Sequence, residues 1–116
     1  MNNFLITRHL VKAFDIGVNF NLYGGRMMDW LDEAGALYAL EKFPNHQFVT
    51  LKISETIFHK PVHINEVLKF YIIDEKIGNT SLTLTINVMR NFEKILSTNM
   101  VFVSIDSEGN KKAIQQ

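Results

Sequence analysis

The sequence predicts an α+β fold in which one long helix packs against an antiparallel sheet of about five strands. Three observations lead to this prediction. Only residues 26–43 have helical composition over several turns, every segment after Pro44 has strand character, and the later segments are joined by turns of hairpin length. The length of 116 residues is that of one ordinary domain, so we expect a single domain over residues 1–116.

The first two segments of the chain are a strand and a loop. Residues 4–12 are expected to form a strand, because Phe4, Ile6 and Leu10 share one parity. Residues 13–23 have no clean period and are rich in Gly and Asn, so we expect a loop there.

Residues 26–43 are expected to form the only long helix. The segment contains no Pro and a single Gly, and at about 1.5 Å per residue it is roughly 27 Å long. Its apolar side chains cover more than half of a helical wheel, so the helix should be mostly buried. They are Met27, Met28, Trp30, Leu31, Ala34, Gly35, Leu37 and Tyr38.

The rest of the chain is expected to form four strands. Val, Ile, Thr and aromatic residues dominate it, and residues 81–92 alternate cleanly between apolar and polar side chains. The joints at residues 78–79 and 91–94 have hairpin lengths. The expected strands are 47–58, 67–77, 81–92 and 95–105.

A sheet of this kind has one helix to cover one face and nothing to cover the other. Phe48, Phe58, Phe70 and Phe102 are expected to point outward. Apolar residues left on a face or edge favour burial in a homo-oligomer.

Composition and charge exclude several classes of protein. The 12 basic residues balance 12 acidic ones, and this lack of a basic excess argues against nucleic-acid binding. The chain has no Cys, which excludes a thiol nucleophile and a Cys-based metal site. We find neither a signal peptide nor an apolar run of 18 residues, so we expect no membrane span and a cytoplasmic location.

Residues 19–25, Asn-Phe-Asn-Leu-Tyr-Gly-Gly, precede Trp-Leu-Asp-Glu-Ala at 30–34. This arrangement resembles the signature of bacterial and mitochondrial acyl-CoA thioester hydrolases. Residues 58–62 and 77–81 also resemble family joints, Phe-x-Arg-Pro-Val and Val-Gly-x-Thr-Ser. Arg8 and Asp15 stand at similar upstream offsets, so the likeness spans residues 8–110.

The resemblance implies a hotdog fold, hydrolysis of acyl-CoA, and a homo-oligomer with its active site at a subunit interface. It implies no cofactor, because coenzyme A is part of the substrate. Three sites depart from the family pattern. Phe20 replaces a usual Gly, Asn21 replaces a residue that is often Asp or small, and Asn65-Glu66 replaces Gly-Asp.

Asp32 is the candidate catalytic carboxylate. It is suited to act as the general base for water or, less often, as a direct nucleophile. It borders the apolar stripe of the helix, and the small residues Gly35 and Ala36 one turn away would leave room for a substrate. The alternative is a solvated carboxylate beside Asp29 and Glu33.

The Gly24-Gly25 turn is the candidate oxyanion site, since free N–H groups at a helix N-terminus suit a developing negative charge. The resemblance assigns polarisation of the carbonyl first to Gly25. The alternative is a plain tight turn. Asn19 is a candidate for orienting water or the carbonyl, or else caps the loop.

Lys60, Thr80 and Ser81 are candidate contacts for coenzyme A by resemblance, and Arg90 is a candidate as a charge at a strand end. Each is otherwise a solvated surface residue. The four His residues show no ligand spacing, so we expect no metal site.

Three functions compete on this fold. The first is hydrolysis of acyl-CoA, which Asp32 favours, and the second is a non-catalytic acyl-CoA binding module or sensor. The third, a hotdog dehydratase, would need a His on or near the central helix, and residues 24–43 contain none.

Overall fold

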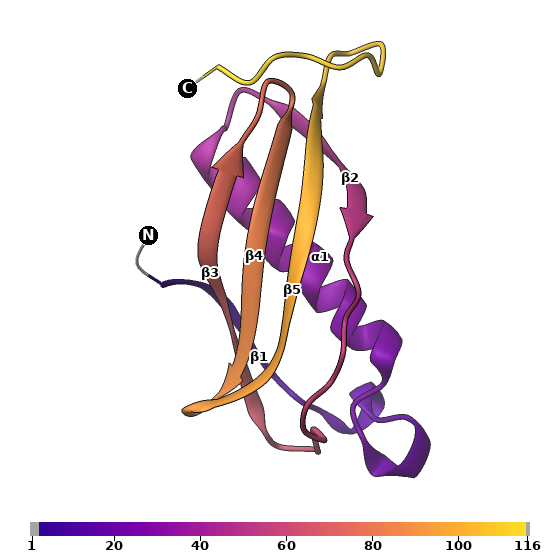
Figure 1. Ribbon diagram of the computed structural model, residues 1–116. Coiled ribbons are helices and arrows are strands. Elements are labelled where there is room, and N and C mark those ends of the chain that lie inside the picture. The colour runs from indigo at the N-terminus through magenta and orange to yellow at the C-terminus, as the bar shows by residue number, and fades with distance from the viewer. Residues whose placement is uncertain (1–2, 116) are drawn as a thin grey trace.

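A computed structural model describes residues 3–115 of the chain (Figure 1). The order is one strand, a loop with two 3-10 turns, one long helix and four strands, as the sequence predicted. The elements are β1 (Phe4–Leu10), the 3-10 turns Ala13–Asp15 and Val18–Phe20, α1 (Gly24–Lys42), β2 (Gln47–Ile53), β3 (Val67–Ile77), β4 (Ser81–Arg90) and β5 (Glu93–Ile105).

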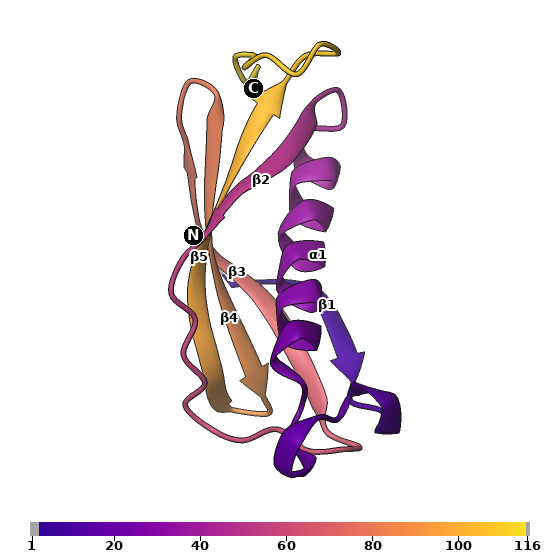
Figure 2. The same ribbon diagram turned by 90° about the vertical axis from the view of Figure 1, so that its right-hand side faces the viewer.

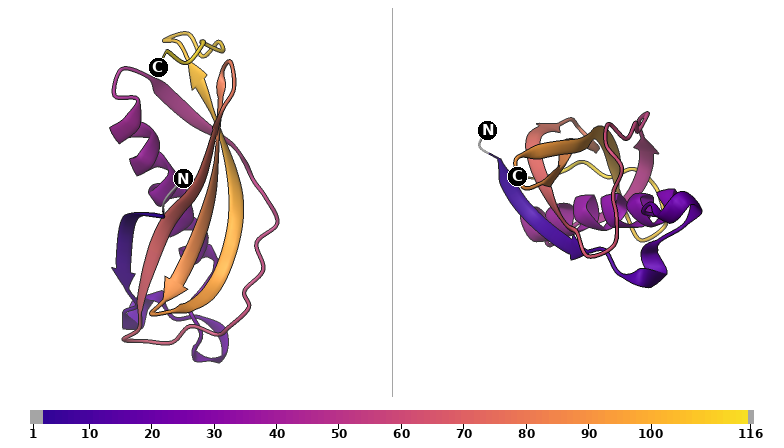
Figure 3. Two further views of the ribbon diagram at one scale, coloured as in Figure 1. Left: turned by 60° about the vertical axis from the view of Figure 1, so that its left-hand side comes forward. Right: turned by 90° about the horizontal axis from the view of Figure 1, so that it is seen from below.

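The five strands form one antiparallel sheet in the order β1-β3-β4-β5-β2. The helix α1 lies against one face of this sheet (Figure 2). Seen along its length, the sheet curls over the helix, with β1 and β2 at its two edges (Figure 3). Within residues 3–115, no helix is both long and apolar enough to cross a membrane.

The core lies between α1 and the concave face of the sheet. The alternation predicted for β4 is confirmed, because its even-numbered apolar residues from Leu82 to Val88 are all fully buried. Gly35 lets the helix approach the sheet closely: a Cβ there would lie 2.6 Å from Cζ of Phe102. The helix buries Met27, Trp30, Leu31, Ala34, Gly35, Tyr38 and Ala39.

Several expected boundaries were wrong. The helix begins at Gly24, two residues earlier than predicted, and β5 begins at Glu93. The strand expected over 47–58 ends at Ile53. Beyond Ile53 the backbone follows β5 with separated hydrogen bonds, from Ser54 N–H to the Asn99 carbonyl and from His59 N–H to the Ile95 carbonyl.

The outward orientation predicted for Phe70 and Phe102 was also wrong, because both side chains are buried against the helix. Apolar residues stand on both parities of β3, with Val67, Tyr71 and Ile73 on the parity opposite to Phe70, so alternation alone did not fix which side is buried. Exposed apolar side chains lie instead on the two edge strands: Phe4, Leu5 and Leu10 on β1, and Val49 and Leu51 on β2.

Candidate functional site

Asp32 lies in the middle of α1 and faces the edge strand β2. The hydroxyl of Thr50 donates a hydrogen bond of 2.6 Å to Asp32 Oδ1. That length is typical of hydroxyl donors to an ionised carboxylate. Asp32 is partly buried, whereas the side chains of its acidic neighbours Asp29 and Glu33 are 70% and 53% exposed. The structure therefore distinguishes Asp32 from a freely solvated helix carboxylate.

No pattern in the sequence indicated Thr50, because it is 18 positions from Asp32 and the two meet only through tertiary packing. The room expected beside Gly35 is also absent, since the ring of Phe102 fills it. Gly35 thus serves close packing of helix on sheet, and open space for a substrate must lie elsewhere around Asp32.

The Gly24-Gly25 turn forms the first residues of α1. The N–H groups of Arg26 and Met27 both bond to the Tyr23 carbonyl, at 3.0 and 3.2 Å. In the described part of the chain, the N–H groups of Gly24 and Gly25 have no backbone or side-chain acceptor. Both residues are exposed, so two free donors stand at the positive end of the helix dipole.

A side chain at Gly25 would crowd the ring of Tyr23. A Cβ at this position would lie 2.7 Å from Cε2 of the Tyr23 ring. A Cβ at Gly24 would meet nothing within 4 Å. The ring of Tyr23 therefore covers Gly25, while Gly24 leaves open space beside the free donors.

Asp15 holds this turn in place. It is 2% exposed, and its carboxylate accepts the Lys12 N–H at 2.8 Å. An ion pair joins its Oδ1 to Arg26 Nε at 3.0 Å, and its carbonyl accepts the Tyr23 N–H at 2.8 Å. The only signal in the sequence was the offset of Asp15 from the Gly-Gly turn.

Asn19 lies at the exposed tip of the loop before α1. Its backbone is left-handed, with φ 56°, a conformation that Asn tolerates better than most residues. The structure thus places Asn19 on the loop that leads into the Gly-Gly start of α1.

Lys60 lies beside this loop. Residues 58–62 line a hollow of about 280 Å³ together with Asn21 and Leu22. The side chain of Lys60 is 54% exposed, with Nζ 3.7 Å from Glu93 Oε2. Its charge is therefore available to a ligand at the hollow.

Arg90 is engaged inside the chain. Its Nη1 donates 2.8 Å hydrogen bonds to the Pro61 carbonyl and to Glu66 Oε1, and the guanidinium also bonds to Glu93. The hydrogen bond from Arg90 lowers the pKa of the Glu93 carboxyl below its ordinary value. Arg90 thus fixes the joint that bears Lys60.

Thr80 and Ser81 lie elsewhere, at the turn between β3 and β4. This turn is at the opposite end of the sheet from the loop that precedes α1 (Figure 1). The Thr80 carbonyl accepts the Ser104 N–H at 2.8 Å. A single chain therefore does not bring Thr80 and Ser81 together with Lys60.

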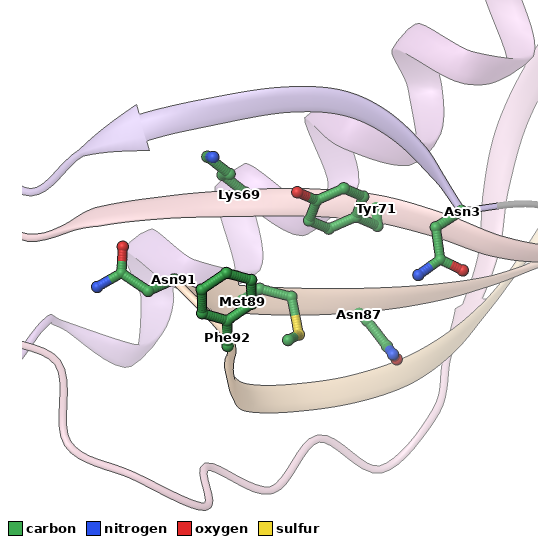
Figure 4. A pocket seen from close by; sticks show the side chains of 7 residues that line it. All are labelled: Asn3, Lys69, Tyr71, Asn87, Met89, Asn91 and Phe92. Carbon is green, nitrogen blue, oxygen red and sulfur yellow. The ribbon is translucent and has the colours of Figure 1, made fainter.

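A separate hollow of about 430 Å³ lies on the face of the sheet turned away from α1 (Figure 4). None of the predicted site residues lines it. Its walls are Asn3, Lys69, Tyr71, Asn87, Met89, Asn91 and Phe92.

Comparison with known proteins gives a consistent result. The sequence model of the Thioesterase superfamily matches residues 20–94, more than half of the chain. The acyl-CoA thioester hydrolase YciA of Escherichia coli strain K12 is 28% identical over 121 residues, which cover 95% of this chain and 89% of that relative.

Solved structures agree with the sequence match. The hexameric thioesterase of Yersinia pestis is 26% identical with a TM-score of 0.89, and the match covers 100% of this chain and 98% of that one. The hexameric hotdog fold thioesterase of Campylobacter jejuni is 24% identical with a TM-score of 0.78, covering 96% and 90%. The predicted hotdog fold and the resemblance to acyl-CoA thioester hydrolases are confirmed, and the chain belongs to the thioesterase superfamily.

Proposed function

We propose that this protein is a thioester hydrolase that cleaves acyl-CoA into a free carboxylic acid and coenzyme A. The observation that carries the proposal is the partly buried Asp32 held by the Thr50 hydroxyl, in a chain of the thioesterase superfamily. The names of the relatives, acyl-CoA thioester hydrolases, support the same substrate class.

The proposed reaction uses Asp32 as the general base. Thr50 occupies Oδ1, which leaves Oδ2 to accept a proton as water attacks the thioester carbon. The carbonyl oxygen becomes an oxyanion that the Gly25 N–H stabilises, with Gly24 beside it. Collapse of the intermediate breaks the C–S bond, and the leaving thiolate of coenzyme A takes up the proton. Direct attack by Asp32, giving an anhydride, is the alternative.

The spacing on α1 supports an active site shared between two copies. Gly25 and Asp32 are seven residues apart, which is about 10.5 Å along a helix. A water that Asp32 activates lies about 3 Å from its carboxylate. A single thioester could therefore contact this water and the Gly25 N–H of the same helix only if it lay almost along the helix axis. We therefore pair Asp32 of one copy with the Gly24-Gly25 turn of another, and Asn19 accompanies that turn.

The protein is accordingly proposed to be a homo-oligomer. The relatives of Yersinia pestis and Campylobacter jejuni are hexameric, and the exposed apolar residues on the edge strands β1 and β2 are available for contacts between copies. Light scattering at micromolar concentration should give a mass of at least two chains. A monomer would contradict the shared site.

Coenzyme A is proposed to bind at the hollow that bears Lys60, with Lys60 facing its phosphates. Arg90 acts indirectly. Its hydrogen bonds hold the backbone carbonyl of Pro61 and the side chain of Glu66 in place beside that hollow. Thr80 and Ser81 can join this site only from another copy. No further cofactor is proposed, and the cytoplasmic location stays a prediction.

A panel of acyl-CoA substrates tests the proposed function. Release of free coenzyme A can be followed with a thiol reagent, and the absence of Cys from the chain removes any background signal. We expect turnover with at least one substrate. Saturable binding of acyl-CoA without turnover would favour the alternative, a binding module or sensor.

A further inference from the structure

Phe20 has an unusual backbone conformation for a large apolar residue. Four described residues other than Gly have a left-handed backbone, and three of them are Asn. The fourth is Phe20, with φ 62°. This conformation is unfavourable for Phe, because its Cβ approaches the following carbonyl oxygen. Strain of this kind gathers at functional sites, so the position of Phe20 is informative.

The contacts within the chain do not explain this strain. The Phe20 side chain is 83% exposed, so its ring gains almost no packing in the folded chain. The base of the loop is nevertheless fixed: the Gly17 N–H bonds to the Asn21 carbonyl and the Leu22 N–H to the Val62 carbonyl, each at 2.8 Å. The loop therefore holds the ring outward in a defined place.

Phe20 is close in sequence to residues of both parts of the proposed site. Phe20 precedes Asn21, which lines the hollow that bears Lys60, and it stands four residues before the free N–H of Gly24. Its neighbours on the loop, Val18 and Tyr23, are 81% and 60% exposed. An apolar surface thus surrounds the approach to the Gly-Gly turn.

The charge of this loop indicates which part of the substrate it meets. Residues 16–25 contain no charged side chain. The phosphates of coenzyme A would favour the cation at Lys60, whereas a neutral apolar loop favours a hydrocarbon chain. The ring of Phe20 is thereby suited to the acyl group rather than to the nucleotide.

We propose that Phe20 is a specificity-determining contact whose ring covers the apolar part of the acyl chain when the thioester lies at the Gly24-Gly25 turn. This inference rests on the proposed function. Acyl groups too short to reach the ring, such as acetyl, gain nothing from it. Medium-length straight chains gain the contact.

Phe20→Ala tests the contact. We expect kcat/KM for octanoyl-CoA to fall about tenfold, a size typical of losing one or two methylene contacts in an apolar pocket. The value for acetyl-CoA should change less than about twofold. Phe92→Ala is the matched control, because Phe92 is 101% exposed and lines the hollow on the other face of the sheet. An unchanged preference for octanoyl-CoA in Phe20→Ala would overturn the proposal.

Phe20→Gly separates a substrate contact from a contact between copies. Gly adopts a left-handed backbone freely and the lost ring was exposed, so Tm should equal or exceed that of the unmodified protein, with the oligomer mass unchanged. Dissociation of the oligomer, or a Tm lower by more than about 5 °C, would assign the ring to another copy and refute the proposal.

Binding measurements keep this test independent of turnover. Calorimetry should show that Phe20→Ala weakens octanoyl-CoA binding while leaving acetyl-CoA binding unchanged, even if the protein hydrolyses neither. Hydrolysis with an unaltered chain-length preference would refute only the role of Phe20. Absence of hydrolysis with an altered binding preference would refute only the proposed function.

Discussion

Replacing Thr50 by Val removes the hydrogen bond to Asp32 while keeping the shape of the side chain. A hydrogen bond to a charged group contributes about 1.5–3 kcal/mol, and the 2.6 Å distance between Thr50 Oγ1 and Asp32 Oδ1 is in the short range for such bonds. If this bond orients the carboxylate in the transition state, kcat should fall by about 10- to 150-fold.

Steady-state kinetics with a good acyl-CoA substrate measures this effect. KM should change less than about twofold, because the Thr50 hydroxyl bonds to the base Asp32 and its loss affects orientation of the base rather than the proposed coenzyme A contacts. Thr50 is exposed on an edge strand, so Tm should shift by less than about 3 °C.

Thr50→Ser is the matched control. It keeps the hydroxyl donor and should retain most of the activity. A Thr50→Val variant with unchanged kcat would refute the positioning role, and so would equal losses in the Val and Ser variants.

Two further predictions concern the frame of the site. Gly35→Ala should lower the free energy of unfolding by about 1–2 kcal/mol, because its Cβ would lie 2.6 Å from Cζ of Phe102 and this overpacking outweighs the gain in helix propensity. Adding Phe102→Leu to that variant should restore part of the lost stability, as measured by thermal denaturation. Glu93→Gln should lower Tm at pH 7, because the hydrogen bond from Arg90 lowers the pKa of the Glu93 carboxyl below its ordinary value. The difference from the unmodified protein should shrink as the pH falls through that lowered pKa and the carboxylate protonates. Equal Tm values at pH 7 would show that the ion pair contributes nothing.

The helix and the order of the strands could be predicted because their patterns are local. The uninterrupted segment after Gly25 has good helix formers, and the clean alternation from Ser81 fixed which residues of β4 are buried. The segment from Val67 is apolar on both parities, so only packing against α1 decides that Phe70 lies inside. Likewise, nothing local showed that the strand from Gln47 ends at Ile53.

The candidate site was predicted unevenly for a similar physical reason. Asp32 and the Gly-Gly turn stand in one continuous segment, so a resemblance in sequence identified them. The contacts of Thr50 with Asp32 and of Asp15 with Arg26 join different elements. No pattern along the chain predicts such contacts, and the structure was needed to find them.

The hydrolysis rate of Asp32→Asn tests the proposed reaction most directly. Asn keeps the shape of the side chain and can still accept the Thr50 hydrogen bond, but it cannot take a proton from water. Asp29→Asn, one turn earlier on the exposed side of α1, is the matched control. We expect Asp32→Asn to lose at least about 100-fold in single-turnover hydrolysis while binding acyl-CoA as before, and Asp29→Asn to keep its activity. Unaltered hydrolysis by Asp32→Asn would contradict the assignment of Asp32 as the catalytic carboxylate.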